Sequence, residues 1–295
     1  MENKNDNKMK NKIILVTGAS DGIGKETAKV LAKQGHTIIL HGRNPQKTQA
    51  VYEEIKAETG NVNIEYLTAD FLSFAEIKRF ADNIKQKYDR LDVLVNNAGA
   101  QFTDKRETTA DGHEKTMMIN VFAPFFLITL LLDLLKKSPS ARVVTVSSAA
   151  HKMGGKPYMD DIELTKHYSM GKAYGLSKLY VIWVMRHFVS EMEKAGITNI
   201  TFNTVHPSSA PTNLARESSK SWKFRIILFL WRPMLITVAK GASSSINAAT
   251  APELEGITGK YFGPKGEEKT CDKYYSPENE QIIWDYCKQT VKPYL

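Results

Sequence analysis

Residues 12–35 read KIILVTGASDGIGKETAKVLAKQG and predict a strand, a glycine turn and a helix in direct succession. The apolar run Lys12–Val16 is typical of a central parallel strand, and a helical pattern follows the turn. Gly18, Gly22 and Gly24 would let the backbone approach a pyrophosphate, whose charge the free N–H groups of the helix stabilise. A plain tight turn is the alternative, but the flanking strand and helix favour a phosphate site.

The same alternation continues along the chain. Further strands are expected at 37–40, 64–67, 91–95, 142–146, 200–205 and near 258–266, and helices at 45–59, from about 73, at 119–135, around 174–192, at 240–251 and after Ser276. Strands that alternate with helices about six times predict an α/β fold. We expect a single Rossmann-type doubly wound parallel sheet with helices on both faces and right-handed crossovers.

Composition limits the class of protein. The chain has 295 residues, 42% of them hydrophobic and 24% charged, as in a soluble globular protein, and we expect one catalytic domain over 12–295. Net charge is +8, but no nucleic-acid motif accompanies it, so we predict a solvated basic surface and no nucleic-acid partner. Cys271 and Cys287 are too few for a disulfide framework and lack metal-ligand spacing, which predicts no metal site and a cytoplasmic protein.

Two segments bear on membrane attachment. Residues 1–11 are polar, and we expect a disordered tail with no secretory signal or N-terminal anchor. The most apolar stretch, 119–135, contains Asn120, Pro124 and Asp133 and is shorter than the ~20 residues of a membrane-spanning helix. We therefore interpret it as a buried helix.

The end of the second strand bears on cofactor choice. An acidic residue at this place hydrogen-bonds the ribose 2′-hydroxyl of NAD, whereas an arginine accommodates the 2′-phosphate of NADP. Here the acidic position holds Gly42, and Arg43 follows it. Because a guanidinium pairs with phosphate through a planar fork of donors, the sequence predicts NADP(H), with NAD(H) less favoured. A surface arginine in a loop is the alternative.

Other polar residues follow the third and fourth strands. Asp70 is a candidate adenine contact, although it would equally cap the helix that begins near Ser73. Asn97, Ala98 and Gly99 would let the backbone pass close to a ribose. Because the carboxyl ends of parallel strands share one edge of the sheet, where such folds bind ligands, these residues are expected to lie together.

Ser148, Tyr174 and Lys178 are the candidates for proton chemistry. Tyr174 and Lys178 are four residues apart, so on a helix they lie on one face. A free phenol titrates near ~10, and an ammonium within about 4–6 Å lowers that pKa by one to a few units. A tyrosine placed in this way would serve as a general acid or base, and Ser148 would hydrogen-bond a substrate oxygen. An exposed tyrosine beside a solvated lysine is the alternative for the pair taken alone.

Five motifs in register resemble the short-chain dehydrogenase/reductase family from Lys12 to about Gly263. They are TGASDGIG at 17–24, NNAG at 96–99, Asn120, Ser148 and Tyr174-x-x-x-Lys178. The resemblance implies that Tyr174 transfers a proton to or from the substrate oxygen and that Lys178 lowers the tyrosine pKa and holds the nicotinamide ribose. It also implies that Ser148 orients the carbonyl. Asn120 would hold a proton-relay water, and a structural hydrogen bond to the backbone is its alternative role.

The glycine motif, the strand ends and the resemblance together predict a set of cofactor contacts. They are Gly18, Ser20, Asp21, Gly22, Ile23, Gly24, Arg43, Asp70, Phe71, Asn97, Ala98, Gly99, Tyr174, Lys178, Pro207 and Thr212. The family has a glycine directly after Pro207, where this chain has Ser208. The extra side chain would lie near the nicotinamide carboxamide.

Within the family, GIGKETAK at 22–29, Arg43 and VSSAAH at 146–151 are similar to the retinol dehydrogenase-like branch. This implies an NADP(H)-dependent oxidoreductase for a hydrophobic aldehyde, ketone or alcohol, retinal-like or another lipid carbonyl. A steroid or quinone reductase of the same family and a non-catalytic NADP(H)-sensing or scaffold protein are the alternatives. We expect a substrate lid at about 208–240, peripheral membrane contact through 222–236, and a homodimer contact on the helices at 119–135 and 174–192.

Overall fold

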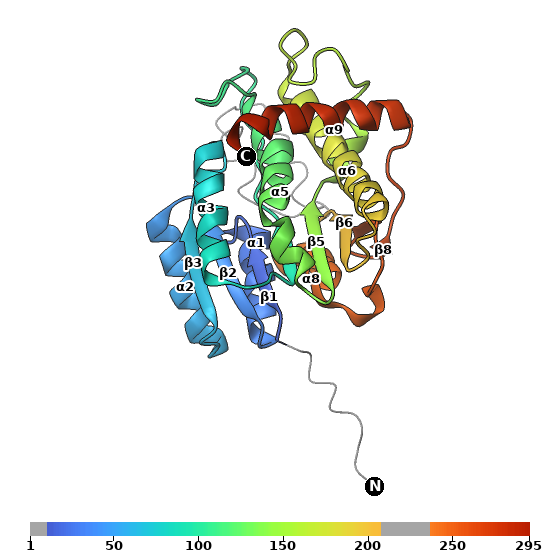
Figure 1. The fold of residues 1–295 in the computed structure, drawn as a ribbon. Helices are drawn as coiled ribbons and strands as arrows, with labels where there is room; N and C mark the ends of the chain where they lie inside the picture. The colour runs from blue at the N-terminus through green and yellow to red at the C-terminus, as the bar shows by residue number, and fades with distance from the viewer. Residues whose placement is uncertain (1–10, 208–236) are drawn as a thin grey trace.

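The computed structural model describes residues 11–207 and 237–295, and its central feature is one sheet of eight strands in the order β3-β2-β1-β4-β5-β6-β7-β8 (Figure 1). The strands are β1 (Ile13–Val16), β2 (Thr37–Gly42), β3 (Ile64–Thr68), β4 (Val93–Asn96), β5 (Ala141–Val146), β6 (Ile200–Val205), β7 (Tyr261–Gly263) and β8 (Gly266–Glu267). Strands β1 to β7 are parallel, and β8 pairs antiparallel with β7. The predicted α/β fold class is therefore confirmed.

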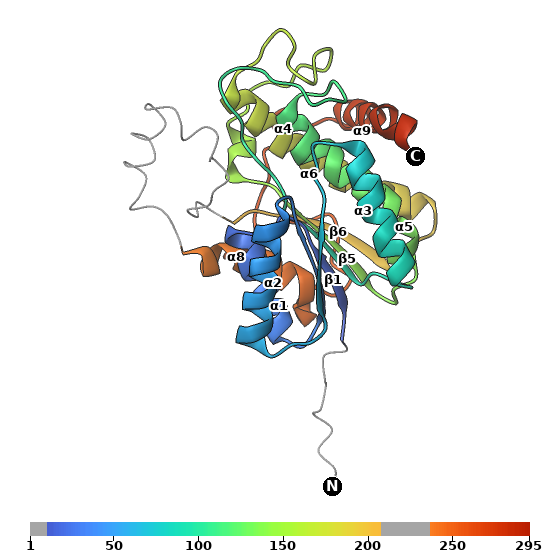
Figure 2. The same cartoon turned by 90° about the vertical axis from the view of Figure 1, so that its left-hand side faces the viewer.

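Helices cover both faces of this sheet (Figure 2). They are α1 (Gly22–Lys33), α2 (Pro45–Thr59), α3 (Phe74–Lys87), α4 (Lys115–Met117), α5 (Ala123–Lys136), α6 (Met170–Lys194), α8 (Val238–Thr250) and α9 (Pro277–Val291). Alternate strand residues enter two cores: Ile14 and Val16 pack toward α1, α2 and α8, whereas Leu15 and Leu94 pack toward α3, α5 and α6. This two-sided burial explains why the strands are apolar runs rather than alternating patterns.

Polar side chains set the helix starts that the sequence predicts. Ser73 and Ser276 accept hydrogen bonds from the amides of Glu76 and Asn279, as N-cap residues do. The α2 helix has the predicted bounds, with Asn44 as its cap and proline at its first turn. The cap of α3 is thus Ser73, and Asp70 instead accepts from the Leu72 amide.

The most apolar helix differs from its prediction in length. From Lys115 to Lys136 the chain is helical without a break, because α4 leads through a π-helical turn, Met118–Phe122, into α5. Those 22 residues are long and apolar enough to cross a membrane by length and composition, so the predicted length was wrong. The interpretation as a buried helix is confirmed, since 78% of its apolar window lies inside the fold.

The C-terminal helix α9 packs against α6 and lies across α5 and α6 in Figure 1. It covers part of the surface from which the sequence predicts a dimer contact. Glu163 joins α9 to the rest of the fold: its carboxylate accepts from the Tyr286 hydroxyl at 2.6 Å, from the ring of His113 at 2.8 Å and from the Glu114 amide at 2.6 Å. The neighbouring Leu164 has a φ of 53°, in the left-handed region that residues other than glycine rarely adopt.

Glu163→Gln is expected to lower the free energy of unfolding at pH 7 by about 1–3 kcal/mol, because buried donors lose their charged acceptor. Burial tends to raise the pKa of Glu163, but the bonds from His113 and Tyr286 lower it overall. A carboxylate with a lowered pKa stabilises the fold above its unfolded pKa, and this contribution is lost as the pH falls through the folded pKa. The difference between variant and wild type should therefore shrink below about pH 4.3 in urea unfolding. The exposed Glu193→Gln serves as control, and an equal loss there would contradict the role of Glu163.

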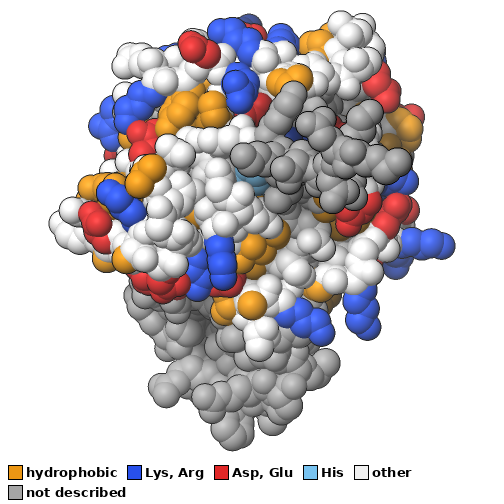
Figure 3. Space-filling model, turned by 90° about the horizontal axis from the view of Figure 1, so that it is seen from below, with side chains coloured by type: hydrophobic (Ala, Val, Ile, Leu, Met, Phe, Trp, Pro, Cys, Tyr) orange, Lys and Arg blue, Asp and Glu red, His pale blue; other side chains and the backbone are white. Residues whose placement is uncertain are grey.

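The surface seen in Figure 3 carries lysine and arginine side chains interspersed with aspartate and glutamate. Elsewhere in the described chain, charges pair between the helices α1 and α2, as in Lys25 with Glu54 at 2.6 Å. Among the described residues on this face, the lysine and arginine side chains do not gather into one basic patch.

Candidate active site

The glycine turn between β1 and α1 is packed against the loop after β4. Gly18 has a φ of 64°, and a methyl group on it would lie 2.9 Å from the Cα of Ala98. Gly24 is tighter still, because a methyl group there would lie 2.3 Å from Asn97 Nδ2 and 2.4 Å from the Gly18 oxygen. Asp21 caps α1 by accepting from the Gly22 amide at 2.8 Å.

The side chain of Asn97 holds this turn through hydrogen bonds to its backbone. Its Nδ2 donates to the carbonyl oxygens of Thr17 at 2.8 Å and Gly18 at 3.2 Å. In return the Thr17 hydroxyl accepts from the amides of Asn97 and Ala98, both at 2.9 Å. The side chain of Asn97 thus stabilises the turn, while Ala98 and Gly99 line the adjoining cleft.

His41 is a site residue that the sequence analysis missed. The predicted strand at 37–40 continues through His41 and Gly42, so the histidine lies inside β2. Its Nδ1 accepts from the Gly18 amide at 3.2 Å, which leaves the proton on Nε2 to donate to the Ala69 oxygen at 3.1 Å. Burial lowers its pKa to about 4, and its ring stacks on Phe71 at 3.9 Å. A polar residue at the end of an apolar run was the signal that could have indicated it.

A cleft of about 440 Å³ opens at the carboxyl edge of β1 to β4. Its walls include seven of the predicted cofactor residues: Gly18, Ser20, Arg43, Asp70, Phe71, Ala98 and Gly99. It also includes residues that were not predicted, namely His41, Asn44, Lys47, Ala69, Leu72, Ala100, Gln101, Phe102, Thr103, Glu107, Lys115 and Ile119. Asp21, Gly22, Ile23 and Gly24 form the turn and helix start beside the cleft rather than its walls. Pro207 follows β6, and Thr212 lies outside the described residues.

Two cations stand at one end of the cleft. Arg43 is exposed and has no ion-pair partner in the described part of the chain. Lys47, also missed by the sequence analysis, pairs with Asp21 at 2.5 Å, and both side chains are 40% exposed. Gly42 is closely packed, since a methyl group on it would lie 2.1 Å from the Thr48 hydroxyl. An acidic side chain would therefore not fit at this position unless Thr48 and Ser20 moved.

Ser148 and Tyr174 come together from the end of β5 and the first turns of α6. Tyr174 is 9% exposed, and burial raises its pKa to about 12, although a hydrogen bond with the Ser148 side chain lowers it. The Ser148 hydroxyl also accepts from the Ala150 amide at 3.1 Å, which caps the short 3-10 turn Ala149–Lys152. At neutral pH the phenol is therefore protonated.

Lys178 and Asn120 lie beside Gly99. A methyl group on Gly99 would lie 2.8 Å from Asn120 Oδ1 and 3.2 Å from Lys178 Nζ. The Lys178 ammonium is buried and donates to the Val146 oxygen at 3.0 Å. Hydrogen bonds thereby link three of the four predicted catalytic residues, Ser148, Tyr174 and Lys178, to the end of β5. The fourth, Asn120, lies with Lys178 beside Gly99.

The expectation that Lys178 lowers the pKa of Tyr174 was wrong for the protein alone. The Lys178 Nζ lies 5.7 Å from the centre of the Tyr174 ring, and burial is the main cause of the pKa shift of both groups. Burial lowers the pKa of Lys178 to about 7, because no anion in the described chain compensates the buried charge. The ammonium uses one of its three donors on Val146, so it has donors left for a ligand.

Asn120 makes the structural hydrogen bonds that the sequence analysis offered as its alternative role. Its Oδ1 accepts from the Ala100 amide at 3.1 Å, and its Nδ2 donates to the Ala100 oxygen at 2.9 Å and the Ser177 hydroxyl at 3.0 Å. The π-helical turn places this side chain across from the segment after β4. Its role in a proton relay stays a prediction.

The amino-acid sequence is similar to those of many known proteins. Residues 12–222 match the family model described as short chain dehydrogenase. Human polyprenol dehydrogenase is 37% identical over 95% of this chain and 85% of its own length. Human retinol dehydrogenase 12 is 36% identical over 85% of this chain and 77% of its own length.

Solved structures show the same architecture. A crystal structure of an uncharacterized protein from Mycobacterium Paratuberculosis has a TM-score of 0.76 at 26% identity and covers 95% of this chain and 93% of its own. A short chain dehydrogenase from Shigella flexneri complexed with NADP has a TM-score of 0.66 at 28% identity, covering 86% of this chain and 97% of its own.

Proposed function

The chain belongs to the short-chain dehydrogenase/reductase family and is an oxidoreductase of CH–OH and C=O groups, and from that premise we propose that it uses NADP(H) to reduce a hydrophobic aldehyde or ketone or oxidise the corresponding alcohol. The observation that carries the proposal is the position of Lys178 beside Gly99. Gly99 lines the cleft, Lys178 Nζ lies 5.7 Å from the centre of the Tyr174 ring, and Tyr174 hydrogen-bonds with Ser148.

The residues of the cleft suit a dinucleotide. At Gly18 and Gly24 the turn leaves no room for side chains, and it would bring backbone amides and the start of α1 close to a pyrophosphate. Lys178 has donors for a ribose hydroxyl, and Phe71 and Asp70 line the opposite end, where an adenine would lie. The bound cofactor would supply the hydride chemistry.

Side chains of this protein would supply and accept the proton of the reaction. In the reduction direction Tyr174 is protonated at neutral pH and would donate to the carbonyl oxygen as that oxygen gains charge. Ser148 would orient the same oxygen with its hydroxyl. Lys178 would place a positive charge near the phenol once its ammonium is held by the ribose, which lowers the cost of forming phenolate.

Arg43 is proposed to contact the 2′-phosphate that distinguishes NADP(H) from NAD(H). Arg43→Ala should weaken NADPH binding by about ten- to a hundredfold, because a hydrogen bond to a charged group contributes about 1.5–3 kcal/mol. NADH lacks the phosphate and should be affected far less. Fluorescence titration with both cofactors measures the difference, and Lys33→Ala, an exposed charge at the far end of α1, is the matched control. Equal losses for NADPH and NADH would remove Arg43 from the phosphate site.

The proposed substrate class rests on the relatives named as polyprenol and retinol dehydrogenases. The residues predicted to form the lid, 208–240, and the membrane contact, 222–236, fall for the most part outside the described residues. Both remain proposals, as does a cytoplasmic location, with which the two free thiols Cys271 and Cys287 are compatible.

The direct test is oxidation of NADPH by the purified protein with retinal, a polyprenal, medium-chain aldehydes, a steroid ketone and a quinone, with NADH in parallel. We expect turnover with NADPH and one class of lipid aldehyde. Turnover confined to the steroid or the quinone would redirect the substrate assignment. NADPH binding without turnover on the panel or on the matching alcohols with NADP would favour a sensing or scaffold role.

A further inference from the structure

His151 ties the segment of the catalytic serine to a distant part of the chain. The ring is 2% exposed and lies in the 3-10 turn Ala149–Lys152. Its Nε2 accepts a hydrogen bond from the Cys271 amide at 3.1 Å, and its Nδ1 lies 2.7 Å from the carbonyl oxygen of Ser148. Because a backbone amide can only donate, Nε2 carries no proton, and Nδ1–H donates to Ser148.

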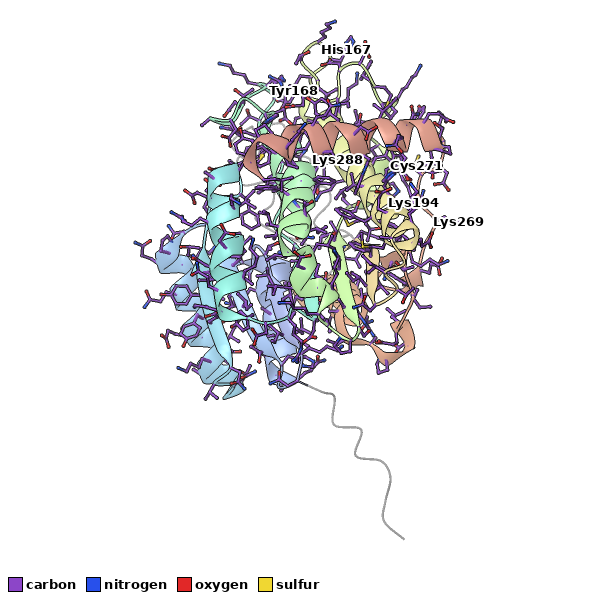
Figure 4. All side chains as sticks on the ribbon, in the orientation of Figure 1. His167, Tyr168, Lys194, Lys269, Cys271 and Lys288 are labelled. Carbon is purple, nitrogen blue, oxygen red and sulfur yellow. The ribbon has the colours of Figure 1, made fainter. Side chains whose placement is uncertain are left out.

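The partner of this contact comes from the segment between β8 and α9. Cys271 lies there beside α6, well away in sequence from the serine turn (Figure 4). Tyr261 of β7 packs edge-on to the His151 ring, with ring centres 5.0 Å apart, and its hydroxyl lies 3.3 Å from Nδ1. The orientation of the ring is thus set by two elements that follow β6.

A second contact holds the same turn against the helix of Tyr174. A methyl group on Gly154 would lie 2.6 Å from the Leu176 nitrogen, and one on Gly175 would lie 2.6 Å from the Gly154 Cα. The backbone after the turn therefore rests directly on α6, one residue from Tyr174. This contact restrains the serine turn on the α6 side, and His151 restrains it on the side of Cys271.

We propose that His151 is a positioning residue, which sets the distance between the Ser148 and Tyr174 hydroxyls by anchoring the Ser148 carbonyl to the backbone at Cys271. The catalytic part of this inference rests on the proposed function, whereas the anchoring of the turn does not. Neither the family motifs nor the spacing of Ser148 and Tyr174 assigns a role to the segment around Cys271 in the active site. The structure makes that segment the support of the serine turn.

Two variants separate the contacts of the ring. In His151→Leu neither hydrogen bond can form, whereas the amide nitrogen of His151→Asn falls near the place of Nδ1 and can still donate to Ser148. We expect His151→Leu to lower kcat about ten- to a hundredfold with the Kd for NADPH unchanged, and His151→Asn, which keeps a donor for Ser148 but loses the acceptor for the Cys271 amide, to show most of the same loss. Full recovery in His151→Asn would show that the bond to Ser148 alone positions the turn and would overturn the anchoring at Cys271. The control is His36→Leu, which replaces a buried histidine directly before β2 and should leave kcat unchanged.

A double-mutant cycle distinguishes positioning from general destabilisation. If His151 acts through Ser148, His151→Leu should have little further effect on kcat in a Ser148→Ala background. The same fold-loss in both backgrounds would overturn the proposal. Thermal unfolding of each variant shows that the comparison is made on folded protein.

Hydrogen–deuterium exchange provides a readout that requires no turnover. The amides of His151 and Met153 donate to Ser148 and Ala150 within the turn. In His151→Leu and His151→Asn, both of which lose the contact with Cys271, they should exchange at least about tenfold faster, with the rate unchanged in His36→Leu. Unchanged exchange in His151→Leu would refute the anchoring itself. A wild-type enzyme without turnover, but with this exchange pattern, would instead refute the proposed function and leave the anchoring established.

Discussion

Tyr174→Phe is expected to lower carbonyl turnover by about a thousandfold while the Kd for NADPH stays close to that of the wild type. General acid catalysis contributes about 10²–10⁴-fold, and the substitution removes only the hydroxyl that would supply the proton. The ring itself lies in α6 and remains to fill its space, because the side chain is 9% exposed and packed in the fold. The measurement is single-turnover NADPH oxidation with the best substrate of the panel, beside a fluorescence titration of the cofactor.

Tyr180→Phe is the matched control for that experiment. It removes the same atom from the same helix, at a fully buried position that faces the core rather than the cleft. Its turnover should equal that of the wild type within a small factor. Unchanged turnover in Tyr174→Phe would overturn the assignment of the proton donor, and an equal loss in Tyr180→Phe would indicate that the effect comes from disturbance of α6.

Gly24→Ala should weaken NADPH binding by roughly a hundredfold and lower the free energy of unfolding by about 1–3 kcal/mol, the usual cost of overpacking. The added methyl group would lie 2.3 Å from Asn97 Nδ2 and 2.4 Å from the Gly18 oxygen, so one of them must move. Either movement breaks the bonds from Asn97 to Thr17 and Gly18, which shape the phosphate-binding turn. Cofactor titration and thermal unfolding measure the two effects.

Gly171→Ala makes the same chemical change without the contact. Gly171 lies in the first turn of α6, and a methyl group there meets nothing within 4 Å. This variant should bind NADPH as the wild type does and be equally or slightly more stable, since alanine favours helix by about 1 kcal/mol over glycine. Wild-type cofactor affinity in Gly24→Ala would show that the turn tolerates a shift of Asn97 and would remove the steric argument.

Local signals in the sequence predicted most of the fold. Apolar runs indicated β1 to β6, and the starts of α2, α3 and α9 were predicted within a residue or two. For α9 the signal was its capping serine, because a helix start depends on side chains next to it in the chain. For α3 the cap offered, Asp70, was wrong, since Ser73 takes that role. The errors were at strand ends and in helix length. The continuation of β2 through His41 and Gly42 depends on pairing with β3, and the π-helical turn at Asn120 on contacts with Ala100, so neither has a local signal.

The sequence by itself determined the doubly wound sheet, the glycine turn, the edge at which the candidate residues gather, and the four-residue spacing of Tyr174 and Lys178, because each follows from periodicity along the chain. Only the tertiary structure decided what surrounds those residues. It buried the tyrosine and the lysine, and burial raises the pKa of Tyr174, against the lowering expected from Lys178, and lowers the pKa of Lys178. It also brought His41 to Gly18 and Cys271 to His151, contacts 23 and 120 residues apart in the chain. Burial and long-range contacts arise from how the elements pack, and no spacing along the sequence records that.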